Sequence, residues 1–172
     1  MNIDDDDFTL FGLPERFELD AAQLDQRWRE LQTQVHPDRF AAQGGAAQRI
    51  AMQWSVRVNQ AYQRLKDPLK RAAHLCERRG APVNAERNTA MPREFLMQQM
   101  AWREALDEAD DDAAVQALQA QVATHERALL GRLQAALDQH HDAAAAAEHL
   151  RALMFVARFR QDVEQRLDAL ES

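Results

Sequence analysis

Residues 31–40 read LQTQVHPDRF, and the proline of this stretch fixes where the first long helix must end. Pro37 disfavours helical backbone in the residue before it and has no backbone N–H, which predicts a helix that stops at His36. Upstream, Asp20 is a candidate N-cap, with Gln23 three residues further on. Between these ends an apolar stripe recurs at helical spacing and predicts one buried face, made of Leu24, Trp28, Leu31 and Val35.

A second amphipathic helix is expected after the Gly44-Gly45 break, and it ends near Lys66-Asp67-Pro68. Its apolar stripe comprises Ile50, Trp54, Val58, Ala61 and Leu65. Two such helices joined by a short connection form an antiparallel hairpin. We therefore expect His36-Pro37-Asp38 at the exposed end of this hairpin.

The composition favours helix along nearly the whole chain. Ala, Gln, Leu, Arg and Glu are abundant, and only 5 of the 172 residues are glycine. No segment shows the sustained alternation of branched residues that indicates a strand, so the fold class is predicted to be all-α. The clearest later break runs from Gly80 to Pro92. It predicts an N-terminal domain over residues 1–80, a linker over 81–91 and a C-terminal domain over 92–172.

The C-terminal domain is predicted to be a compact three-helix bundle. Its helices are expected at about residues 92–110, 112–139 and 143–170, with Asp112 and Asp142 as N-caps of the last two. The inner face of the second helix is expected to consist of Val115, Leu118, Val122, Leu129, Leu133 and Leu137. That of the third is expected to consist of Leu153, Val156, Phe159, Val163, Leu167 and Leu170.

Charge, cysteine and hydropathy exclude several classes of function. The formal net charge is −7, and residues 81–172 hold 16 of the 28 acidic but only 9 of the 21 basic residues, so no nucleic-acid partner is expected. Cys76 is the only cysteine and forms neither an internal disulfide nor a thiolate metal site. No 18-residue apolar stretch and no signal-peptide pattern is seen, which predicts a cytoplasmic protein without a membrane partner. Three histidines could suggest a metal site, but their spacing favours solvated turns: His140, His141 and His149.

The His-Pro-Asp stretch also permits a catalytic interpretation, because a histidine beside a carboxylate could act as a general base. No nucleophile or oxyanion donor accompanies His36 and Asp38, so an enzyme is the least favoured alternative. We expect no catalytic residue and no cofactor. The simplest structural interpretation is a turn in which Asp38 caps the backbone and His36 is solvated.

Several motifs occur in a characteristic order: Phe8-Thr9-Leu10-Phe11-Gly12-Leu13, then His36-Pro37-Asp38-Arg39-Phe40, then Val58-Asn59-Gln60-Ala61-Tyr62. In this order and spacing the first 70 or so residues resemble a J-domain. The resemblance implies a DnaJ-class co-chaperone that binds a DnaK-class chaperone and stimulates its ATP hydrolysis. His36, Pro37 and Asp38 would be indispensable, and Arg27, Arg29 and Arg39 would help to bind the chaperone. The preceding helix is less basic than is usual in J-domains.

The helix predicted at residues 92–110 carries more apolar surface than a bundle core needs. Phe95, Trp102, Leu106 and Ala109 form one stripe, at about 100° per residue. A second face lies roughly opposite and comprises Leu96, Met97, Met100, Glu104 and Glu108. On the third helix Phe155 lies off the core stripe. This face either packs against the first domain or a second copy, or it is a protein-docking surface.

The stretch Phe95-Leu96-Met97-Gln98-Gln99-Met100, placed after a J-domain, resembles the HscB family of iron–sulfur co-chaperones. The resemblance implies a C-terminal domain that recruits the scaffold protein IscU and delivers it to the DnaK-class chaperone HscA. The residues that would contact IscU are Leu96, Met97, Met100, Glu104, Glu108 and Phe155. Ala101 stands where the bacterial pattern has a glutamate. The alternative is a general J-protein that holds unfolded polypeptides on the Leu/Met face.

Overall fold

The computed structural model describes residues 1–84 and 91–172, and over these residues the chain forms helices, turns and loops without a strand. The predicted all-α fold class is therefore confirmed. The chain divides into two compact units, Met1–Leu75 and Cys76–Ser172. Of the predicted linker, residues 85–90 lie outside the described residues.

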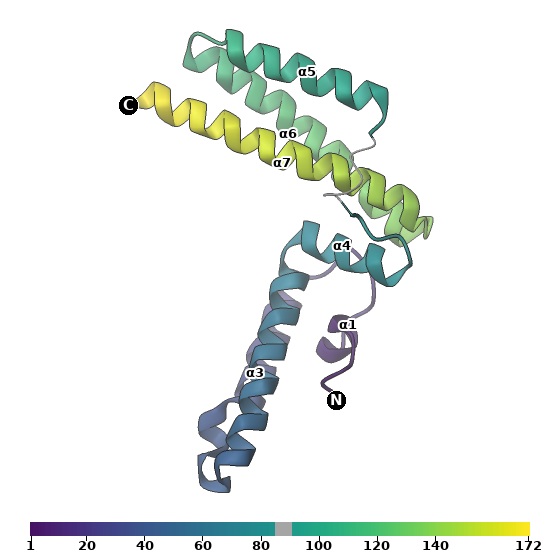
Figure 1. Cartoon of the computed structure of the whole chain (residues 1–172), viewed down its shortest axis with the longest axis vertical. Coiled ribbons are helices and arrows are strands. Elements are labelled where there is room, and N and C mark those ends of the chain that lie inside the picture. Colours follow the sequence, from purple (N-terminus) through teal and green to yellow (C-terminus); the bar gives the residue numbers. More distant parts are fainter. Residues whose placement is uncertain (85–90) are drawn as a thin grey trace. The chain divides into compact units, whose positions relative to one another are not determined.

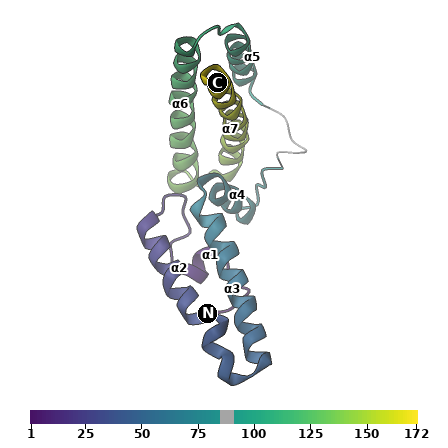
Figure 2. The ribbon, with the colours of Figure 1, turned by 90° about the vertical axis from the view of Figure 1, so that its left-hand side faces the viewer.

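The first unit is a helical hairpin with short helices packed on it. Its elements are α1 (Asp7–Phe11), α2 (Ala21–Val35), the 3-10 helix η1 (Pro37–Gln43), α3 (Gly45–Lys66) and α4 (Pro68–Arg78), whose end belongs to the second unit. α2 and α3 lie side by side and antiparallel (Figure 2). α2 begins where predicted, since the Asp20 side chain accepts hydrogen bonds from the backbone of Ala22 and Gln23. It also ends where predicted, because His36 has extended backbone with φ −61° and ψ 129°.

The core of this unit confirms most of the predicted apolar stripes. Val58, Ala61 and Leu65 of α3 are fully buried against α1 and α2. Ile50 was predicted to be buried but is 56% exposed. The reason is that α2 stops at Val35, so the first turns of α3 face only the short helix η1.

Polar contacts fix how α2 lies on α3. Asn59 Oδ1 accepts from Trp28 Nε1 at 3.0 Å and from Gln32 Nε2 at 2.7 Å. The Tyr62 hydroxyl donates to Asp25 at 2.6 Å, and its ring stacks on Trp28 with centroids 4.8 Å apart. Such directional contacts favour one register over simple apolar packing. They hold the two helices so that the connection between them is presented at the end of the hairpin.

A buried carboxylate attaches α1 to α3. Asp7 is fully buried and accepts from Arg57 Nη1 at 2.8 Å and from Arg64 Nε at 2.6 Å. Burial by itself raises the pKa of Asp7, but the hydrogen bonds from Arg64 and Arg57 outweigh it and hold the pKa below its ordinary value. The ionised carboxylate thus stabilises the N-terminal segment against the hairpin.

The second unit contains the predicted three-helix bundle. It comprises α5 (Arg93–Glu108), α6 (Asp112–Gln134), which continues as a π-helical turn η2 (Ala135–Gln139), and α7 (Ala143–Glu171), all visible in Figure 1. Asp142 caps α7 as predicted, through a bond from the backbone of Ala145. For α6 the predicted cap was wrong by one residue. Asp111 has extended backbone and accepts from Ala114 N, whereas Asp112 is already helical.

The bundle core also follows the predicted stripes, except at the end of α7. All six predicted α6 and η2 positions are buried, as are Leu153, Val156, Phe159 and Val163 of α7. Leu167 is only half-buried and Leu170 is exposed, which corrects the prediction. α7 has 29 residues, and its last turn projects into solvent.

Candidate functional site

The loop His36-Pro37-Asp38 joins α2 to η1, with Pro37 and Asp38 as the first residues of η1, and is shaped by its own histidine. The backbone N–H of Asp38 donates to His36 Nδ1 at 3.2 Å, so His36, and not Asp38, caps the turn. This corrects the expected turn, because the residue with extended backbone before η1 is the one whose side chain reaches the free N–H. The Asp38 side chain is 92% exposed and lies 3.7 Å from His36 Nδ1. Its carboxylate is therefore free to meet another protein.

The three arginines predicted around this loop do not share one location. Arg39 follows the loop directly, and its Nη1 donates to the carbonyl of Thr33 at 3.3 Å. Arg29 is seven residues before His36, about two helical turns, and so lies on roughly the same side of α2. Arg27 is nine residues before His36, on about the opposite side. All three arginines are exposed, and only Arg39 directly adjoins the loop in the chain.

One face of α5 is exposed, with apolar residues toward its N-terminal end and glutamates toward its C-terminal end. We call it the docking face and define it as Leu96, Met97, Met100, Glu104 and Glu108. All five side chains are exposed, and Met100 reaches 72%. The opposite side of α5 is buried through Phe95, Trp102, Leu106 and Ala109. The docking face therefore adds nothing to the core of its own unit.

Phe155 differs from the rest of the predicted set. It belongs to α7 and is half-buried, and the guanidinium of Arg158 lies over its ring at 5.5 Å from the centroid. A part of the ring remains available at the surface. Its truncation would thus remove both packing and any contact with a partner.

Sequence reasoning missed the contacts that hold α5 in place. His125 of α6 stacks on Phe95, with centroids 5.9 Å apart, and meets Trp102 edge-on at 5.0 Å. Arg103 Nη1 pairs with Asp162 of α7 at 2.9 Å. Burial, and secondly the charge of Arg132, lowers the pKa of His125, so the neutral imidazole fits this site. These residues carry no local pattern that could have indicated their partners.

The remaining histidines do not gather around a metal position. His140 and His141 are exposed at the turn after η2, whereas His149 is half-buried on α7. Across residues 1–84 and 91–172, no group of three His, Cys, Asp or Glu side chains is placed to hold a metal ion. Among the same residues, no helix is long and apolar enough to cross a membrane.

Known proteins resemble the chain over both units. A co-chaperone protein HscB homolog from Bordetella petrii is 52% identical over 160 residues, which cover 92% of this chain and 94% of that protein. The chain belongs to the HscB family. A homolog from Burkholderia multivorans is 49% identical over 175 residues, covering 100% of this chain and 99% of its own. Residues 91–164, which include the docking face, match the family described as the HSCB C-terminal oligomerisation domain.

Solved HscB structures have the same fold. Chaperone HscB from Vibrio cholerae aligns with a TM-score of 0.81 at 38% identity, over 96% of this chain and 99% of that one. The crystal structure of human co-chaperone protein HscB aligns with a TM-score of 0.88 at 26% identity, over 96% of this chain and 84% of the human chain. The loop and the docking face thus both lie in a chain of HscB architecture.

Proposed function

We propose that this HscB-family chain is a co-chaperone of iron–sulfur cluster biogenesis that connects two other proteins. Residues 1–80 act as a J-domain that binds HscA and stimulates its ATP hydrolysis, and residues 92–172 bind the scaffold IscU and deliver it to HscA. The observation that carries the proposal is the presence of two exposed surfaces that contribute little to the core. One is the Asp38 carboxylate and the other is the Leu/Met face of α5.

The loop is suited to act on the site of another protein. Pro37 restricts the backbone, and the bond to His36 Nδ1 fixes the position of Asp38 before any partner arrives. An exposed carboxylate held in this way can accept a charge-assisted pair of hydrogen bonds from an arginine of HscA. Arg39, which directly follows Asp38, adds positive charge next to it, and Arg29 adds more about two turns back on α2. The chain itself then needs neither a catalytic group nor a cofactor, because the hydrolysis takes place on the chaperone.

The docking face is suited to a folded partner with an apolar patch. Methionine adapts its shape to a contacting surface, and Met97 and Met100 supply two such side chains beside Leu96. Glu104 and Glu108 continue the face as an acidic rim, the usual arrangement at the edge of an interface. Ala101 offers no carboxylate within this region. We therefore expect IscU to bind through apolar burial, with fewer charged contacts than in relatives that carry a glutamate there.

Two other candidate partners for the docking face must be distinguished from IscU. A general J-protein would hold unfolded polypeptides there. The family matched by residues 91–164 is described as an oligomerisation domain, which makes a second copy of the chain another candidate. Unfolded clients would compete with one another regardless of sequence, whereas IscU binding requires a folded surface. Self-association would depend on the concentration of this chain alone.

Reconstitution with purified proteins tests the proposal. The immobilised chain is expected to retain folded IscU and HscA together, and an excess of an unfolded polypeptide should not displace IscU. Displacement of IscU by that polypeptide would favour the general J-protein. Failure to retain IscU at any concentration would contradict the proposed client. A cytoplasmic location accords with this function and with the buried thiol of Cys76, which has no disulfide partner.

A further inference from the structure

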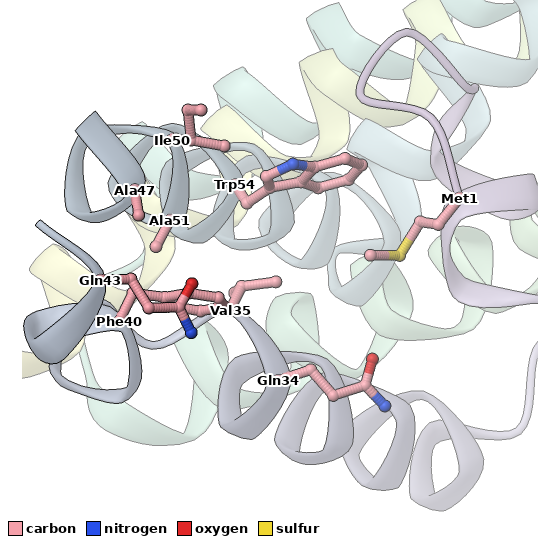
Figure 3. A pocket seen from close by; sticks show the side chains of 9 residues that line it. All are labelled: Met1, Gln34, Val35, Phe40, Gln43, Ala47, Ile50, Ala51 and Trp54. Carbon is pink, nitrogen blue, oxygen red and sulfur yellow. The ribbon is translucent and has the colours of Figure 1, made fainter.

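A hollow of about 410 Å³ opens beside the His-Pro-Asp loop and is lined almost entirely by apolar side chains. Figure 3 shows Ile50 and Trp54 of α3 on one side, Val35 of α2 and Phe40 of η1 facing them, and Met1 at one end. Val35 and Ala51 are buried and form its floor. The hollow exists because α2 ends early and the short η1 leaves the first turns of α3 partly uncovered.

The apolar lining is open to solvent in a way that the core does not require. Ile50 is 56% exposed, and Trp54 and Phe40 are half-buried. Concave apolar surfaces with few polar groups are typical of binding sites, and this volume lies in the range of small-ligand pockets. The volume is sufficient for one large side chain of a partner. The shape thus favours a single apolar residue of a partner.

The hollow adjoins the loop that we assign to the chaperone. Val35 immediately precedes His36, and Phe40 follows Asp38 by two residues. A protein that contacts the Asp38 carboxylate therefore binds within a few residues of the lining residues Val35 and Phe40.

The charge around the hollow indicates which kind of partner segment would bind there. Residues 21–66, which include both long helices of the hairpin, carry seven basic and three acidic side chains. Arg39 is exposed directly before the lining residue Phe40, and none of the lining residues is acidic. A segment that places an apolar side chain here would gain from acidic neighbours.

We propose that this hollow receives a large apolar side chain, carried on an acidic segment of the same DnaK-class chaperone that the loop engages. The inference rests on the proposed function, since that function supplies the partner. It assigns two separate tasks to one surface. Asp38 triggers ATP hydrolysis, whereas the hollow holds the chaperone in place.

The test compares two exposed residues of one helix. Ile50→Glu places a charge at the hollow, and Met52→Glu is the matched control. Met52 is 59% exposed but lies about 200° around α3, where it lines a different hollow with Ile3 and Val56. The measurement is HscA ATPase rate against concentration of the full chain. Ile50→Glu should raise the concentration for half-maximal stimulation by about tenfold and leave the maximal rate unchanged, while Met52→Glu should shift it by less than twofold.

Further arms make each outcome decisive. Ile50→Lys should raise the half-maximal concentration less than Ile50→Glu does, because a lysine suits acidic neighbours. An unchanged half-maximal concentration for Ile50→Glu, with thermal unfolding like the parent, overturns the hollow and leaves the proposed function standing. Equal effects of Ile50→Glu and Met52→Glu, or a parent dimer in sedimentation that Ile50→Glu dissociates, would also overturn it. A parent chain that fails to stimulate HscA contradicts the proposed function itself.

Discussion

His36 holds Asp38 in place: Nδ1 of the imidazole accepts the backbone N–H of Asp38 at 3.2 Å, while the Asp38 carboxylate points to solvent. A contact within the chain thus fixes the shape of the loop. The Asp38 carboxylate, the group available to a partner, makes no short hydrogen bond of its own among the described residues. Substitution of Asp38 should impair only the binding of a partner to the loop. Substitution of His36 should also change the conformation of the loop itself.

Asp38→Asn should abolish stimulation of HscA while the fold and IscU binding persist. The lost contact is expected to be a hydrogen bond to a charged group, worth about 1.5–3 kcal/mol, and the exposed side chain supports no core packing. Steady-state ATPase rates measure the effect. Glu30→Gln, which changes an exposed carboxylate of α2, is the control and should stimulate like the parent. Full stimulation by a folded Asp38→Asn variant would exclude the loop as the trigger.

Truncation of Leu96, Met97 and Met100 to alanine should weaken IscU binding without lowering stability. Central interface residues typically cost about 2 kcal/mol or more each on truncation, and not additively, whereas exposed positions change stability by only about 0.5 kcal/mol. Calorimetric titration with IscU and thermal unfolding measure the two effects. Stimulation of HscA by the variant alone should survive.

Two comparison variants show whether the docking face is correctly assigned. The pair Met52→Ala and Val56→Ala truncates exposed apolar residues of the other unit and should bind IscU normally. Trp102→Ala removes a buried ring and should destabilise the bundle by about 3–5 kcal/mol. If the triple variant unfolds as readily as Trp102→Ala, or binds IscU as tightly as the parent, the docking face is wrong.

Asp7→Asn should destabilise the first unit by about 1.5–3 kcal/mol, because it removes the charge from the hydrogen bonds with Arg57 and Arg64, while Arg57 keeps its bonds to backbone carbonyls and Arg64 is partly solvated. The pKa of Asp7 is lower in the folded chain than its ordinary value of 3.8. Its contribution is therefore fully present above pH 3.8 and is lost as the pH falls through the folded-state pKa. Urea unfolding at several pH values measures both. Asp4→Asn, at an exposed position, should change neither stability nor its pH dependence.

Acidification should loosen the attachment of α5. The pKa of His125 is lowered by burial and then by Arg132, and that of His149 by the same two causes. A histidine that stays neutral when packed stabilises the fold fully above its ordinary pKa of 6.5, and this contribution is lost as the pH falls below it. Urea midpoints followed by the NMR signals of the α5 backbone amides should decrease between pH 7 and pH 5. His125→Phe should make the urea midpoint less dependent on pH. If the midpoint of this variant falls with pH as steeply as that of the parent, His125 is not the cause of the pH dependence.

The sequence predicts those features of the fold that depend on neighbours along the chain. The end of α2 at Pro37, the cap at Asp20 and the buried stripe of α6 follow from proline chemistry, capping and helical spacing. The second apolar face of α5 follows from helical spacing in the same way, since the three buried positions of α5 lie on roughly the opposite side.

Other features depend on contacts between distant residues and could not be predicted. Asp7 meets Arg57 across 50 positions, and neither residue carries a local sign of the other. Ile50 fits the helical stripe of α3, yet only the length of α2 decides whether it is covered. His125 similarly gains its aromatic neighbours through the packing of α5 on α6.

The ATPase rate of HscA with this chain and IscU, alone and together, tests the central claim most directly. We predict that the chain alone stimulates HscA and that the two together stimulate it more than the sum of their separate effects, because one chain holds the client and triggers the ATPase. Merely additive stimulation, or none by the chain alone, would contradict the account.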